Sequence, residues 1–239
     1  MRRILMSLLA AVCLTPAFSQ NLMLEVFSGV NITAYDTPNN FSFNDKNASY
    51  FPIGFRIAGG LPNVQIGGEY HTDLTNATFS KSDAFLSTET VIENSYYGGF
   101  IRANISPNPA YAFGIILKAG VGIYDASMKY RILDDPSAPQ PEIDFDFDGQ
   151  LGFNGGLGFS LPIAEKLHLE AGYVFNYVKR EGGNKFPGFI DYNAFHHSFQ
   201  LGFSYNFLFG ESAKRYDSNK RWKNGWRSSA GGRYKKWGN

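Results

Sequence analysis

The chain has 239 residues, of which 44% are hydrophobic and 16% aromatic, and its formal net charge is +1 at pH 7. This length suits one large domain or two small ones, and all-β barrels commonly reach it as a single unit. A bundle of transmembrane helices is excluded, because no internal stretch approaches the ~20 consecutive apolar residues that a spanning helix needs. The 26 glycines, 22 phenylalanines and 14 tyrosines favour strands and turns instead.

Residues 1–19 have the features of a signal peptide. Arg2 and Arg3 precede an apolar run of about 15 residues, which is too short to span a membrane as a helix. The sequence A-F-S at 17–19 predicts cleavage after residue 19. The alternative is a short hydrophobic anchor that stays attached. Cys13, the one cysteine, lies in this segment, so the mature chain is expected to have no disulfide and no cysteine-based metal site or nucleophile.

Between residues 20 and 210, apolar and polar residues alternate with a period of two in eight segments. Such alternation is typical of a β-strand whose two faces meet different surroundings. The clearest segment, EIDFDFDGQLGFNGGLGFSLP, is far longer than the ~5–6 residues of an ordinary strand. The eight segments, in chain order, are 22–33, 51–58, 64–74, 96–105, 115–124, 142–162, 167–176 and 198–207.

The connections between these segments alternate between short and long. Short turns are expected at 60–63, 106–110 and 162–165, and long loops at 36–49, 76–93, 127–145 and 179–194. This order predicts an all-β fold, an eight-stranded antiparallel up-and-down transmembrane β-barrel with periplasmic turns and extracellular loops. In hydrocarbon every backbone N–H and C=O must be paired within the protein, which a closed barrel achieves.

The alternative fold with the same period is a soluble β-sandwich or a lipocalin-like barrel. In that fold the apolar face would be the inner one, and the outer face would be rich in Lys and Glu. Here the polar face consists mostly of Gly, Ser, Asn and Gln, as expected for the packed interior of a narrow barrel. The composition of this face therefore favours the membrane barrel.

The last strand, SFQLGFSYNFLF at 198–209, alternates aromatic with polar residues. With the signal peptide and the strand pattern over residues 21–209, it resembles the small outer-membrane β-barrel proteins of Gram-negative bacteria, the OmpA- and OmpX-type and porin-like barrels. The resemblance implies residence in the cell outer membrane, contact with its lipid and lipopolysaccharide, and recognition of the last strand by the barrel-assembly machinery. The chain departs from that family in continuing for residues 210–239 after this strand.

Six charged residues fall on the inward face, in the periplasmic half of the predicted barrel. Eight strands leave an interior just wide enough for side chains to fill, so we expect a belt of ion pairs that closes the bore. The alternative is a small gated channel lined by the same groups. The belt comprises Glu25, Arg56, Glu69, Arg102, Lys118 and Glu170, with His168 nearby.

Two motifs are candidate chemical sites. Lipid A deacylases, barrels of the same size, carry a His-x-Ser motif with a Glu on a neighbouring strand, and His196 and Ser198 have that spacing. No strand follows to supply the acid, and Ser198 is expected to face inward, so polar residues at a strand mouth are the favoured interpretation. DFDFDG at 144–149 resembles the start of a calcium loop, but Gly155 stands where that loop needs Glu. No catalytic, cofactor-binding or metal-binding residue is therefore predicted.

Residues 211–239 form a basic tail. It has nine Lys and Arg against two acidic residues, a net charge of +7, whereas residues 20–210 have eleven against nineteen, a net charge of −8. Without a period of 2 or 3.6, the tail is expected to be disordered when free. In the periplasm it would suit headgroups, the cell wall or an acidic envelope protein, and the compartment argues against nucleic acid. The residues expected to bind are Arg221, Trp222, Trp226, Arg233 and Trp237.

These features together predict a non-enzymatic barrel of the outer membrane, with no cofactor. We expect a structural, adhesion or envelope-complex role, exercised through the extracellular loops and the tail. A porin-like channel for small solutes is the alternative, and a lipid A deacylase-like enzyme is less favoured.

Overall fold

The computed structural model describes residues 21–36, 47–82, 87–106, 112–132, 142–164, 166–180 and 192–209. The regular structure in these ranges is β-strand, and no helix there is long and apolar enough to cross a membrane. The predicted signal peptide and the tail lie outside the described residues. The strands are β1 (Asn21–Asp36), β2 (Asn47–Tyr50), β3 (Pro52–Leu61), β4 (Val64–Asp73), β5 (Ala77–Ser82), β6 (Ser87–Ile105), β7 (Gly114–Ile132), β8 (Glu142–Ala164), β9 (Leu167–Arg180) and β10 (Tyr192–Leu208).

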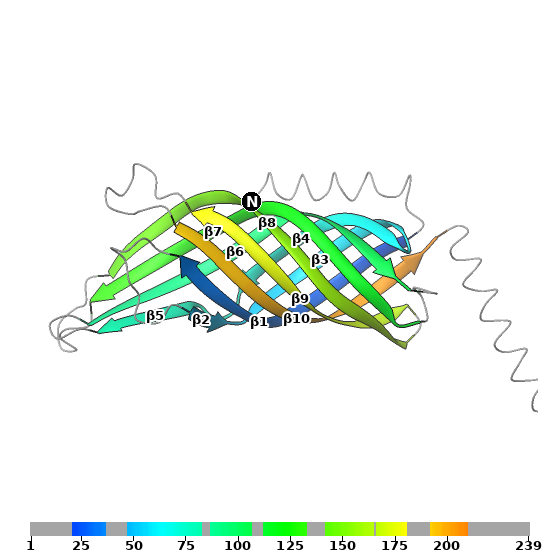
Figure 1. Cartoon of the computed structure of the whole chain (residues 1–239), viewed down its shortest axis with the longest axis horizontal. Helices are drawn as coiled ribbons and strands as arrows, with labels where there is room; N and C mark the ends of the chain where they lie inside the picture. Colours follow the sequence, from blue (N-terminus) through cyan, green and yellow to red (C-terminus); the bar gives the residue numbers. More distant parts are fainter. Residues whose placement is uncertain are drawn as a thin grey trace, which may run out of the picture.

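Eight of the described strands close into an antiparallel barrel. They pair in the order β1, β3, β4, β6, β7, β8, β9 and β10, and β10 pairs back with β1 from Asn21↔Leu208 to Asp36↔Asn193. Figure 1 shows β1 (blue) and β10 (orange) side by side in a ring of tilted strands. Because the ring has no free edge, its backbone donors and acceptors are paired within the protein, as hydrocarbon requires. The predicted eight-stranded up-and-down barrel is confirmed.

The remaining two strands, β2 and β5, continue two of the barrel strands after a break. β2 pairs with β1 in the same register as β3, and Phe51 separates β2 from β3. Pro52, which has no N–H, begins β3, where a proline is tolerated. β5 pairs with β6 beyond the end of β4. The Leu74 amide donates to the Phe51 carbonyl (2.7 Å), so the two breaks lie side by side.

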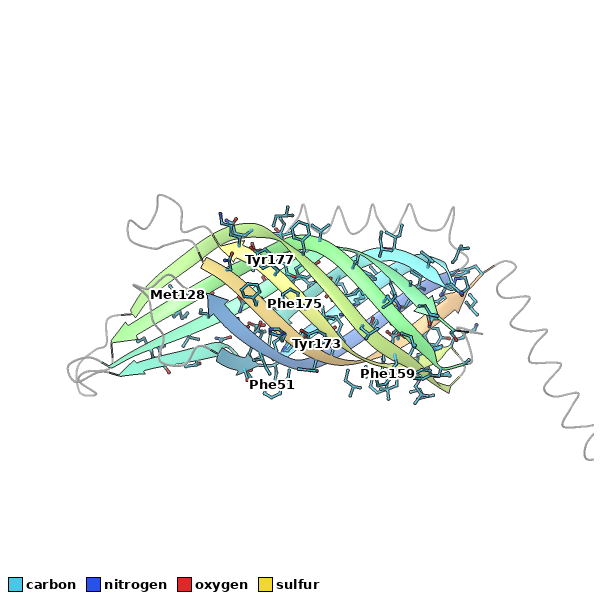
Figure 2. All side chains as sticks on the ribbon, in the orientation of Figure 1. Phe51, Met128, Phe159, Tyr173, Phe175 and Tyr177 are labelled. Atoms are coloured by element: carbon cyan, nitrogen blue, oxygen red, sulfur yellow. The ribbon has the colours of Figure 1, made fainter. Side chains whose placement is uncertain are left out.

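The barrel wall has an apolar outer face and a packed inner face. Val26 and Leu201 on the outside are 61% and 54% exposed, whereas the inward Met23 is fully buried. Phe51 and Phe159 project away from the ribbon in Figure 2. In water such a continuous apolar surface would promote aggregation, so this surface is one that lipid covers. The predicted orientation, with apolar side chains outside, is confirmed.

At the loop end, β5 to β8 extend past the apolar band as the protruding sheet (residues 77–82, 87–95, 125–132 and 142–149). This is the left end of the barrel in Figure 1. A β-bulge opposite Asp125 marks the boundary on β7 and β8. A Cβ atom on Gly149 would come within 2.3 Å of Asp125 Oδ1, so the bulge needs a glycine there.

The protruding sheet corrects the loop prediction, which placed loops at 76–93 and 127–145. Both ranges contain strand. In this region the apolar face changes sides: on β7, Val121 faces out within the apolar band, whereas Met128 faces in and Lys129 faces out. At the membrane boundary, the apolar residues of β7 therefore move from the outward positions to the inward positions of the strand. A search for one continuous period of two stops at that shift, which is why the outer ends of β6 and β7 were missed. The outer end of β8 lies within the predicted segment 142–162.

Candidate functional site: the charged network inside the barrel

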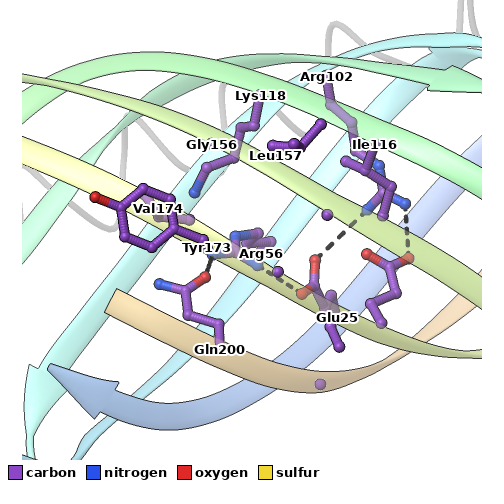
Figure 3. Close-up of a pocket in the computed structure, with 15 residues that line it drawn as sticks. Glu25, Arg56, Arg102, Ile116, Lys118, Gly156, Leu157, Tyr173, Val174 and Gln200 are labelled. Atoms are coloured by element: carbon purple, nitrogen blue, oxygen red, sulfur yellow. Dashed lines mark hydrogen bonds and ion pairs between the residues drawn. The ribbon is translucent and has the colours of Figure 1, made fainter. Parts of the chain in front are cut away.

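Six charged side chains form a network across the bore, in the half nearer the short turns. Each comes from a different strand and points inward because successive strand positions alternate between the two faces. None of these side chains is more than 7% exposed. Figure 3 shows several of them with the interactions that join them. The six are Glu25 (β1), Arg56 (β3), Glu69 (β4), Arg102 (β6), Lys118 (β7) and Glu170 (β9).

Arg56 is the centre of this network. Its Nη1 lies 2.5 Å from Glu25 Oε1, and its Nε lies 2.6 Å from Glu69 Oε2. Both carboxylates stand directly opposite Arg56 on the neighbouring strands. Its Nη2 donates to the Gln200 side chain, and its guanidinium carbon lies 3.8 Å from the centre of the Phe27 ring. The fork of the guanidinium thus joins three strands of the wall.

The other two cations complete the network. Lys118 Nζ lies 2.5 Å from Glu69 Oε2. Arg102 Nη2 lies 2.6 Å from Glu170 Oε1, and its Nη1 lies 3.6 Å from the second oxygen of Glu25. Arg102 and Lys118 stand opposite each other on β6 and β7, yet they turn to different carboxylates. Three carboxylates balance three cations, which is the condition under which buried charges are tolerated.

The structure brings together all six residues that the sequence placed in the belt. The sequence also put Arg56 opposite Glu69, and this pair is present. Two neutral partners were not foreseen, Gln200 on Arg56 and Ser204, whose hydroxyl donates to Glu170. Both lie at inward positions of β10, so the alternation along this strand could have predicted that they face the network.

A layer of rings lies above the network, toward the extracellular side. His71 stacks on Tyr96 with ring centres 5.0 Å apart, and Tyr96 meets Tyr124 at 4.5 Å. Polar partners hold the phenols: Asn154 donates to the Tyr96 hydroxyl (2.8 Å), and Tyr124 donates to Asn176 (2.9 Å). No motif in the sequence predicted this layer of rings. They fill the bore because they share the inward parity of the charged residues below them.

His196 and Ser198, the enzyme-like pair, both face the interior and are 3% and 1% exposed. His196 Nδ1 lies 2.7 Å from Thr33 Oγ1 and 2.9 Å from the Tyr50 hydroxyl. Ser198 Oγ accepts a hydrogen bond from Gln200 (3.0 Å). The predicted inward orientation of Ser198 is confirmed, so this hydroxyl points away from lipid.

A cavity of about 40 Å³ adjoins the network. A water molecule needs roughly 10–15 Å³ of such space, so the cavity has room for a few waters. Its polar side is lined by charged groups of the network and by Gln200, and its other side by glycines of β8, β9 and β10 (Gly156, Gly158, Gly172 and Gly202). Glycine on the inward face makes room here that a larger side chain would occupy.

The sequence matches the family model of the outer membrane protein beta-barrel domain over residues 5–207. The chain belongs to this family. The protein is therefore a barrel of the cell outer membrane. Among curated proteins, none matches the sequence.

The chain is similar to several solved structures at low sequence identity. Neisserial surface protein A is 14% identical, with a TM-score of 0.53, and the match covers 79% of this chain and 98% of that protein. Ail of Yersinia pestis is 12% identical, with a TM-score of 0.45 and coverage of 78% and 99%. The outer membrane protease OmpT of Escherichia coli is 8% identical, with a TM-score of 0.44 and coverage of 79% and 97%. The first of these likenesses shows the fold.

Proposed function

We propose that this protein is a non-enzymatic outer-membrane barrel whose bore is closed by its own side chains. Its role would be structural, adhesive or as part of an envelope complex, exercised through the extracellular loops and the basic tail. The observation that carries the proposal is the charge-balanced network, in which Arg56 alone joins Glu25, Glu69 and Gln200 across the bore.

Two successive layers support a closed bore. A solute passing through the barrel would have to separate buried ion pairs, and breaking one such pair costs about 3–5 kcal/mol. It would then meet the stacked rings of His71, Tyr96 and Tyr124. A passive channel presents a lower free-energy barrier to its solutes than the ion-pair network and the layer of rings together. The cavity beside the network is the one observation that favours the channel alternative.

Conductance in planar lipid bilayers tests the closed bore. The wild-type protein is expected to give no current steps above those of a protein-free bilayer. The variant Tyr96→Ala/Tyr124→Ala, which removes two rings of the upper layer, reports whether that layer adds to the barrier. A wild-type conductance that is stable and equal to that of the ring variant would contradict the closed bore and favour the small-solute channel.

The protruding sheet supports a role at the cell surface. Its outward side chains include Glu89, Glu93, Lys129 and Arg131, and Arg131 Nη1 lies 3.9 Å from Glu89 Oε2. A charged outward face beyond the apolar band is in water, where it can meet molecules outside the cell.

The enzymatic alternative predicts a shortened lipid A, so unchanged lipid A masses in cells with and without the protein would argue against it.

For the tail, we propose contact with an acidic envelope protein, the cell wall or inner-leaflet headgroups, through Arg221, Trp222, Trp226, Arg233 and Trp237. Deleting Ser212–Asn239 tests this part. Crosslinking in intact cells should recover an envelope partner with the full chain and lose it with the deletion. Recovery of the same partners by both forms would show that the tail does not bind them.

A further inference from the structure

A column of aromatic rings runs along the outer face of β9 and β10. Neighbouring rings alternate between the two strands, with centre-to-centre distances of 5.4, 6.1, 5.5, 6.0 and 5.4 Å. Figure 2 labels the three members from β9. We call this column the aromatic ladder; from its outer end it comprises Tyr177, Phe195, Phe175, His197, Tyr173 and Phe199.

The aromatic ladder crosses the outer margin of the hydrocarbon. On β10 the outward side chains from Phe199 to Phe209 are apolar or aromatic and exposed. This stretch already supplies the ~9–11 residues that a strand needs to cross a bilayer. His197 and Phe195 therefore lie beyond it, on the extracellular side, at the depth of the lipid headgroups. Ordinary interfacial rings need to occupy only one depth, whereas this column spans several.

Polar groups hold the ladder at its headgroup end. The Tyr173 hydroxyl lies 2.7 Å from His197 Nδ1, and the Tyr177 hydroxyl donates to Asn193 Oδ1 (3.0 Å). Each contact fixes a ring from β9 against β10, so the ring faces are oriented before any ligand arrives. Lys179, an exposed outward cation, stands opposite Asn193 on the same pair of strands. A positive charge thus lies at the outer end of the ladder.

Two small outward residues lie beside the ladder, on β7 and β8. Gly155 of β8 faces outward opposite Phe175, and a Cβ built on it would meet nothing nearer than 4.0 Å. Its neighbour on β7 is the exposed Ala119. The open space at Gly155, next to a row of rings, can accommodate a methylene chain.

We propose that the aromatic ladder, Lys179 and the small residues Gly155 and Ala119 form a binding site for one phosphorylated glycolipid of the outer leaflet. Sugar rings present C–H groups that pack on the faces of Tyr177 and Phe195. Lys179 pairs with a phosphate as a compact point charge. An acyl chain lies over Gly155 and Ala119. The site depends on the outer-membrane location, and it does not depend on whether the bore is closed.

Native mass spectrometry after reconstitution tests the site. The full chain is placed in vesicles of phosphatidylethanolamine containing lipid A, a bis-phosphorylated acylated glucosamine disaccharide, and is then extracted in mild detergent. The ladder variant is Phe175→Leu/Tyr177→Leu/Phe195→Leu. The matched control, Phe55→Leu/Tyr70→Leu/Tyr97→Leu, removes a row of outward rings on β3, β4 and β6 that stand opposite one another. A heat-modifiable gel shift confirms that each variant is folded.

Wild type and the control variant should each retain one lipid A molecule per chain, and the ladder variant should retain at least tenfold less. Lys179→Gln should lower retention of lipid A and leave retention of its dephosphorylated form unchanged. Equal retention by the ladder and control variants would overturn the proposal. Retention of phosphatidylglycerol as strong as that of lipid A would also overturn it, because the surface would then be unselective. A dimer mass that only the ladder variant loses would overturn it as well, because a second copy of the chain would then occupy this face.

Discussion

Arg56 shows how single residues decide the state of the barrel interior. It stands between Glu25 and Glu69, and it is the group that connects them. Lys118 has its ion pair with Glu69, and Arg102 has its closer ion pair with Glu170. Removing Arg56 leaves three buried carboxylates with two cations, and an unbalanced buried charge is far more costly than an absent pair.

Glu25 is the carboxylate whose neutralisation should best offset the loss of Arg56. Arg56→Met should lower the free energy of unfolding by about 3–5 kcal/mol. Arg56→Met/Glu25→Gln should recover part of this loss, because Glu69 keeps Lys118 and Glu170 keeps Arg102. The control, Arg56→Met/Glu69→Gln, should recover less, because Lys118 then loses its carboxylate. Urea unfolding in lipid vesicles measures all three. Equal recovery by the two double variants would contradict this account of the network.

At the scale of strands and turns, the barrel depends on tight connections at its periplasmic end. β3 and β4 are joined at Pro62 and Asn63, and Gly60 precedes this turn with φ of 148°, a conformation that L-residues with a side chain rarely adopt. A Cβ atom on Gly60 would also lie 2.5 Å from the Val64 carbonyl oxygen. The turn therefore requires glycine for both conformation and space.

Gly60→Ala should destabilise the barrel by about 1–3 kcal/mol, the usual cost of a residue held in such a region. Gly155→Ala is the matched control, because its Cβ would point into open space on the lipid face. That substitution should change stability by less than about 1 kcal/mol, in the stabilising direction. Vesicle unfolding experiments on both variants provide the comparison. A loss for Gly155→Ala as large as that for Gly60→Ala would mean that the turn conformation is not the cause.

On the scale of the whole molecule, the surface changes character along the barrel axis. The outer face is apolar from the short turns to about Val121 on β7, and it is polar from Asp125 onward, where the protruding sheet begins. The same strands therefore meet lipid along one part and water along another. The same kind of substitution should therefore be costly in the lipid zone and nearly neutral in the water zone, because lipid cannot solvate a charge.

Leu201→Arg places a charge on the lipid face within the apolar band of β10 and should cost about 2–4 kcal/mol. Ser127→Arg places the same charge on the protruding sheet, opposite Glu93, and should change stability by no more than about 0.5 kcal/mol. Unfolding in vesicles of defined thickness separates the two effects. Similar small changes at both positions would argue that lipid does not cover the face of Leu201.

The alternating pattern was enough to predict the eight two-faced strands, the outward orientation of the apolar side chains and the inward position of the six charged residues. The reason is that the period of two is a local property of an extended chain, so that each residue's face follows from its position alone. Glu25 and Glu170 could be assigned to the bore in this way, although their partners could not.

The pattern could not show which carboxylate each cation meets, where the strands end and which outward rings touch. These depend on the stagger between strands and on closure of β10 against β1, which bring together residues as distant in sequence as Arg56 and Gln200. In the protruding sheet, the outer ends of β6 and β7 were hidden because the apolar face changes sides at the membrane boundary, whereas the outer end of β8 was part of a predicted strand. The position of a residue within its strand determines which face of the barrel wall it lies on. The register between neighbouring strands determines which residues it contacts there.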